Sequence, residues 1–188
     1  RPARADGWSE LREEEGRFIV DMPTNGRERV TPEQKFFGAE STEVAWVVKL
    51  GSDTLIEARF LDLPEAMYAE AFPGGTIPAD GGRAFIRTLT ENMVAEQIAA
   101  GGKVVRNEDS AFAGVASQRV ELRNVTSPEL KKSDLHVEAV YFLVGKRLYV
   151  LSTESIYTKD RSDQFTPLVQ NFQLINASTP PADTTPSQ

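Results

Sequence analysis

The sequence predicts an α+β fold, in which helices pack on an antiparallel β-sheet of about six to eight strands built from hairpins. Apolar and polar side chains alternate in several short segments, which is typical of strands with one buried face. Turn sequences that contain glycine separate these segments at hairpin spacing. Residues 90–100 instead have the apolar periodicity of a helix. With 188 residues, of which 40% are hydrophobic, the chain fits a single domain with tails.

The two ends of the chain differ in composition from the segment between them. Residues 1–16 are polar and charged, and Trp8 and Leu11 lie three positions apart, so we expect an N-terminal arm, either a short helical turn or a segment that docks these two side chains. Residues 176–188 combine prolines with serines and threonines, a low-complexity composition that predicts a disordered tail. Residues 17–175 form the predicted α+β domain.

Two hairpins are expected at the start of this domain. Residues 17–22 alternate in polarity, and a proline followed by an Asn-Gly pair predicts a turn from which residues 29–37 return. Residues 44–48 and 55–61 also alternate, and the sequence around Gly51 is typical of a tight connection. Each pair of segments is therefore predicted to form neighbouring strands.

A long loop and the main helix follow. Residues 71–82 contain so many glycines and prolines that we expect an exposed loop without regular structure. Apolar side chains at helical spacing predict a helix over about residues 90–100, with Thr88 or Thr90 as its N-cap. Gly101 supplies the left-handed residue that commonly ends a helix.

The second half of the domain is predicted to contain most of the sheet. Residues 103–108 and 116–125 are expected to be strands. Residues 137–144 and 147–155, joined by a short glycine turn, are apolar on both faces, which is typical of central strands covered on both sides. The spacing of apolar residues then predicts a closing helix at about residues 162–172.

Three segments carry a resemblance to a known family: GRFIVDMP at 16–23, YFLVGKRLYVL at 141–151, and the closing segment 165–174. They resemble the PsbP-like fold family, which includes the extrinsic lumenal subunit of photosystem II, DcrB-like bacterial envelope proteins and a nuclear import factor of the same architecture. The resemblance extends over about residues 16–175. It implies non-enzymatic roles, as assembly or stabilising subunits of membrane-bound complexes or as envelope proteins.

Composition argues against several classes of function. The excess of 28 acidic over 21 basic residues gives a net charge of -7, which disfavours nucleic acid binding. The absence of cysteine excludes disulfides, thiol nucleophiles and thiolate-bound metal cofactors. No apolar run reaches the about 18 residues that predict a transmembrane helix. The chain begins at Arg1, which fits either a trimmed sequence or a mature exported protein, and we expect a periplasmic or otherwise exported protein.

The sole histidine defines the one candidate metal group, which consists of Asp134, His136 and Glu138. At a spacing of two, these side chains share one side of a strand and present two carboxylates and an imidazole. We favour the alternative of an exposed strand entry after a charged turn, because metal triads need ligands oriented by a further layer of hydrogen bonds. We therefore predict no catalytic residue, no metal site and no cofactor.

The loop at residues 71–82 holds the candidate partner-binding residues, Phe72, Ile77 and Pro78, which we expect to be exposed anchors. Its glycines precede a helix, and a helix N-terminus can bind an anion. However, the loop lacks the ending of a phosphate-binding loop, and Asp80 would repel a phosphate.

Four aromatic residues on alternating strand positions, Trp46, Phe60, Tyr141 and Tyr149, are predicted to be core, or alternatively to line a pocket between helix and sheet. The leading hypothesis is a non-catalytic binding or assembly subunit with a protein partner, associated with a larger envelope or membrane complex. The alternative is a carrier or sensor of a small apolar ligand bound between sheet and helix. A metal-dependent hydrolase is a third hypothesis, which depends on His136 alone.

Overall fold

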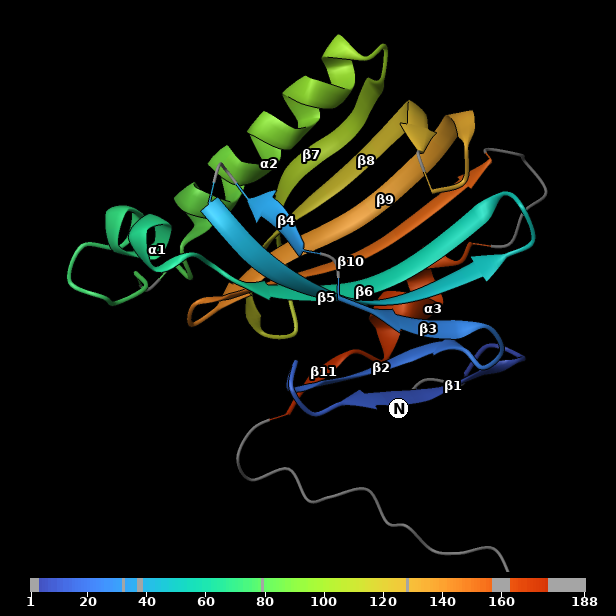
Figure 1. Ribbon diagram of the computed structural model, residues 1–188, viewed down its shortest axis with the longest axis horizontal. Coiled ribbons are helices and arrows are strands. Elements are labelled where there is room, and N and C mark those ends of the chain that lie inside the picture. The colour runs from blue at the N-terminus through green and yellow to red at the C-terminus, as the bar shows by residue number, and fades with distance from the viewer. Residues whose placement is uncertain are drawn as a thin grey trace, which may run out of the picture.

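The protein is described here from a computed structural model that covers residues 4–31, 33–36, 39–78, 80–127, 129–156 and 163–175. Its elements form three layers (Figure 1): helix α2 lies on one face of a large twisted sheet, and a small three-stranded sheet with helix α3 lies on the other. The architecture is α+β with antiparallel strands, as the sequence predicted. The expected tail at 176–188 lies outside the described residues.

The large sheet is built from hairpins of consecutive strands. Its centre is formed by β9 and β10, whose apolar faces are both covered, as predicted. The predicted hairpin around Gly51 is also confirmed, because β5 and β6 pair from Glu43↔Leu61 to Leu50↔Thr54. Across the sheet the order is β3 (Arg27–Val30), β5 (Ala39–Leu50), β6 (Thr54–Asp62), β10 (Arg147–Ile156), β9 (Lys132–Val144), β8 (Val115–Ser127) and β7 (Lys103–Phe112), and β4 (Glu33–Phe36) pairs with β5.

The small sheet joins the two ends of the domain. Strand β2 (Phe18–Pro23) lies between β1 (Trp8–Glu13) and β11 (Gln173–Leu174), and both pairings are antiparallel. The expectation of a helical turn at the N-terminus is therefore wrong, because residues 8–13 form a strand. Pairing with β2 outweighs the local spacing of Trp8 and Leu11, since it buries Leu11 and satisfies the backbone of both strands.

The predicted opening hairpin is also wrong. The chain does turn after Pro23, but β3 pairs with β5 in the large sheet instead of returning along β2. A turn sequence fixes a reversal of direction and leaves the choice of sheet open. The guanidinium of Arg27 holds this crossover, because it donates hydrogen bonds to the backbone oxygens of Met22 at 2.6 Å and Ser9 at 2.7 Å.

The helices differ from the prediction mainly at their starts. Helix α2 (Arg83–Ala99) begins seven residues before the predicted start, and neither threonine is its N-cap. Thr90 is fully buried and donates to the carbonyl of Arg87. The predicted glycine stop is confirmed, because Gly101 has φ 98° and the next amide donates back to Gln97. Helix α3 (Phe165–Gln170) lies within the predicted range, and α1 (Glu65–Ala71) was not predicted.

Two apolar cores lie on opposite faces of the large sheet. The first, between the two sheets, is rich in aromatic rings: Phe18, Phe60, Phe142, Tyr149, Phe165 and Phe172. The second lies under α1 and α2 and is mostly aliphatic, with Ile86, Leu89, Val94, Val120, Leu122 and Val150. Strict alternation along β9 and β10 sends successive side chains to the two cores, so these strands hold the layers together.

Gly82, the residue before α2, has a conformation and a neighbour that both require glycine. Its φ is 72°, and an added Cβ would lie 3.0 Å from the Phe72 ring. We expect Gly82→Ala to lower the free energy of unfolding by about 2–3 kcal/mol, from left-handed backbone strain and overpacking. Urea denaturation measures this loss. Gly75→Ala is the matched control, because Gly75 has φ 73° with nothing within 4 Å. Equal losses in both variants would contradict the role given to the Phe72 contact.

Candidate functional site: a cavity between helix and sheet

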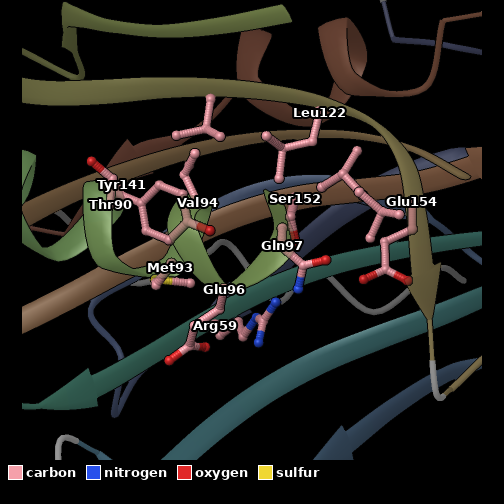
Figure 2. A pocket seen from close by; sticks show the side chains of 13 residues that line it. Arg59, Thr90, Met93, Val94, Glu96, Gln97, Leu122, Tyr141, Ser152 and Glu154 are labelled. Atoms are coloured by element: carbon pink, nitrogen blue, oxygen red, sulfur yellow. The ribbon is translucent and has the colours of Figure 1, made fainter. Parts of the chain in front are cut away.

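A cavity of about 180 Å³ lies between α2 and the face of the large sheet that α2 covers (Figure 2). The helix packs over β7, β8 and β9, whereas β6 and β10 supply the far side of the cavity. Three groups of residues line it: Thr90, Met93, Val94, Glu96 and Gln97 from α2; Val120, Leu122, Val125, Val137 and Tyr141 from β8 and β9; and Arg59, Ser152 and Glu154 from β6 and β10.

One side of the cavity is apolar because of strand alternation. Val120 and Leu122 are two residues apart on β8, so both point to the face that α2 covers. Val137 of β9 is the cross-strand partner of Leu122 and lines the same wall. Val94 of α2 is buried against the same core, while Met93 is more than a third exposed. The wall therefore offers contact to an apolar body, and the partly exposed Met93 lies at its edge on α2.

The other side is a charged network on β5, β6 and β10. Arg59 forms ion pairs with Glu57 at 2.9 Å and with Glu43 at 3.7 Å, and the hydroxyl of Ser152 donates to Glu57 at 3.2 Å. Burial works to lower the pKa of Arg59, but the charges of Glu57 and Glu43 outweigh it and raise this pKa. The network thus fixes a positive charge among carboxylates at the polar end of the cavity.

Two buried polar atoms at this end have no hydrogen-bond partner among the described residues: Nε of Arg59 and Oε2 of Glu154. Figure 2 shows the polar ends of Arg59, Gln97 and Glu154 on one side of the cavity. Desolvation, together with the charges of Glu57 and Glu129, raises the pKa of Glu154. Burial likewise raises the pKa of Tyr141, the aromatic residue of the cavity. Buried polar atoms are normally paired, so these two are candidate ligand contacts.

Two of the three predicted metal candidates contact side chains of the neighbouring strand β8. His136 Nε2 lies 2.9 Å from Oε1 of Glu121, and Glu138 accepts a hydrogen bond from Arg119 at 3.2 Å. Asp134 is exposed. Within the described ranges, no group of three or more His, Asp or Glu side chains is arranged to hold a metal ion. His136 and Glu138, which the sequence spacing places on one side of β9, are therefore each bonded to a side chain of β8 instead of to each other.

The predicted partner-binding residues lie between α1 and α2. Phe72 is buried against Tyr68 and Phe85, so the expectation that it is exposed is wrong: its ring closes the second core. Ile77 is half-buried against that core and Pro78 is exposed. An open hollow of about 570 Å³ lies between the two helices and is lined by Ala66, Met67, Glu70, Ala71, Phe85, Thr88, Leu89 and Asn92.

The other sequence candidates have structural roles. Phe60 and Tyr149 belong to the aromatic core, Trp46 packs against it, and of the four aromatic residues only Tyr141 lines the cavity. The amide of Gly82, before α2, donates to the carboxylate of Asp80 at 3.1 Å. An acidic side chain thus already occupies this end of α2, which argues against an anion site there.

Comparisons with known proteins place the fold in a known class. The architecture is that of the PsbP-like fold, as the sequence resemblance implied. The solved structure of cyanobacterial PsbP (CyanoP) from Synechocystis sp. PCC 6803 matches with a TM-score of 0.52 and 15% sequence identity, over 90% of this chain and 94% of that chain. No family model matches the sequence. No curated protein matches it either.

Sequence reasoning located the cavity only in part. The alternative of a ligand between the sheet and the main helix names its location, and Tyr141 is one of its residues. Arg59 and Glu154 were missed because a charged residue on a strand normally points to solvent. A usable signal exists: Arg59 lies on a strand in which seven of nine residues are buried, and Glu154 directly follows six consecutive buried residues of β10. Among the described residues, no helix is long and apolar enough to cross a membrane.

Proposed function

We propose that this protein is a non-catalytic accessory subunit that binds a protein partner outside the cytoplasm, at a larger envelope or membrane complex. The observation that supports this most is the PsbP-like fold, which extends over nearly the whole chain and its solved neighbour. Fold likeness alone does not define function, so the proposal also rests on the chemistry of the surface. Across β8 and β9, Arg119 forms an ion pair with Glu138, and Glu121 lies within hydrogen-bond distance of His136.

The partner surface that we propose is the α1–α2 region. Met67, Ala71, Ile77 and Phe85 are apolar and only partly buried, and they surround or adjoin the open hollow between the helices. Exposed apolar patches of this kind typically mark protein interaction sites. The exposed Pro78 extends the patch along the loop, so two of the three sequence candidates, Ile77 and Pro78, remain part of the proposal.

Affinity purification of the native protein from its source cells tests this function. We expect a partner protein in stoichiometric amount, and we expect Pro78→Glu to weaken its binding about tenfold or more, because a charge enters an apolar contact. Val30→Glu is the matched control, since it places the same charge on an exposed apolar residue of β3. Purification of the wild-type protein alone, or equal losses in both variants, would count against the proposal.

The cavity favours a second function, which is the carriage or sensing of a small ligand. The cavity has apolar walls and a few convergent polar groups, the usual composition of a ligand site. Its volume of about 180 Å³ limits the ligand to a small molecule. This function is compatible with a protein partner, because the cavity and the α1–α2 hollow are lined by different residues.

A further inference from the structure

The cavity between α2 and the large sheet also indicates the chemistry of its ligand. We propose that it binds a small neutral molecule that has an apolar body and a polar group able both to donate and to accept a hydrogen bond, such as a hydroxyl. This inference rests on the second proposed function, carriage or sensing of a small ligand.

The volume sets the size of the apolar body. The cavity measures about 180 Å³, and an apolar protein cavity of about 150 Å³ binds benzene. A single ring with one substituent therefore fits, whereas a lipid chain or a dinucleotide does not. Val94 and Leu122 are buried at the apolar wall, and the ring of Tyr141 supplies a flat contact surface (Figure 2).

The two buried atoms without a hydrogen-bond partner indicate which polar group the ligand carries. Nε of Arg59 can only donate a hydrogen bond, while an ionised Glu154 can only accept one. A hydroxyl can accept from the first or donate to the second, so this neutral group suits whichever of the two atoms it reaches. An ammonium group has no acceptor for Arg59, and a carboxylate has no donor for Glu154.

The surrounding charges argue against an anionic ligand. Glu57 and Glu43 pair with Arg59, and Glu154 adds a third carboxylate to the network around one guanidinium. Glu96 lines the cavity from α2. This excess of negative charge disfavours a carboxylate ligand, because like charges in a poorly solvated site repel strongly.

A series of probes that share one phenyl ring tests the proposal on the full chain: benzyl alcohol, toluene, benzylammonium and benzoate. Titration of ¹⁵N-labelled protein, followed by NMR, measures each dissociation constant and locates the shifted residues. We expect benzyl alcohol to shift the amides of Val94, Leu122 and Glu154 and to bind about five- to tenfold more tightly than toluene. Benzoate is expected to be the weakest of the four.

Variants of Glu154 test the polar contact directly. Glu154→Leu is expected to remove the preference for benzyl alcohol over toluene, whereas Glu91→Leu, at an exposed position of α2, is expected to keep it. If Glu154→Leu does not fold, the relative affinities of the four probes for the wild-type protein still test the proposed ligand chemistry. Equal binding of toluene and benzyl alcohol, or tightest binding of a charged probe, overturns the ligand chemistry and leaves carriage in place. Failure of all four probes to bind overturns carriage itself.

Discussion

Replacing Phe142 with alanine is expected to lower the free energy of unfolding by about 3–5 kcal/mol. Phe142 is fully buried at the centre of the aromatic core, where its ring stacks on Tyr149 at 5.0 Å and meets the edge of Phe172 at 5.4 Å. Residues of β9, β10 and the C-terminal segment hold this site rigidly, so the cavity left by the ring would not collapse. Urea denaturation measures the loss, and thermal denaturation should show a decrease of roughly 10 °C in Tm.

Phe85→Ala is the matched control for Phe142→Ala, because the same atoms are deleted from a half-buried position beside an open hollow. The cost there is expected to be less than about half as large, since water can fill the space and little apolar area is lost. If the two variants lose the same free energy of unfolding, packing in the aromatic core is not the main interaction that holds the two sheets together.

The second large effect is expected at Glu13, whose buried carboxylate joins the small sheet to the large one. It accepts hydrogen bonds from Trp46 at 2.6 Å and from Arg29 at 3.1 Å, and its other oxygen accepts from the amide of Gly16 at 3.3 Å. Glu13→Ala leaves the half-buried indole N–H of Trp46 and the Arg29 charge without this acceptor. We expect a loss of about 2–3 kcal/mol, limited by the contact of Arg29 with water, measured by urea denaturation.

The same carboxylate should make stability depend on pH. Burial alone would raise the pKa of Glu13, but the hydrogen bonds from Arg29 and Trp46 outweigh it, so this pKa lies below its ordinary value. The stabilisation is therefore complete above the ordinary glutamate pKa of about 4.3 and is lost as pH falls through the folded-state value. Glu13→Gln keeps the shape of the side chain and should remove this part of the pH dependence. An unchanged acid profile in that variant would contradict the assignment.

The elements that sequence reasoning predicted well are those with local signals. The hairpins at Gly51 and Gly145 combine a turn sequence with two-residue alternation, and both signals act within a few positions. The crossover after Pro23 was missed because β2 pairs with strands from both ends of the domain. Helix α1 was missed because its seven residues give too few turns for a clear period.

The candidate site was less accessible to prediction, because a cavity depends on the side chains that fail to fill it. Arg59 and Glu154 are 95 positions apart in the sequence. Their strands, β6 and β10, become neighbours only when the chain folds. Their unpartnered atoms are a property of three-dimensional packing, which no pattern along the chain records. The register of β6 against β10 decides that both side chains face α2.

The small sheet also sets the order in which the protein can be completed during synthesis. Strand β2 needs β11, and the buried carboxylate of Asp21 accepts a hydrogen bond from Asn171, which is 150 positions away. On the ribosome, Phe18 and its neighbours must therefore wait until the last strand emerges. We expect the large sheet to form first and the N-terminal strands to be the last to become protected. During this interval, the edge of β2 that β11 later covers is available to a chaperone.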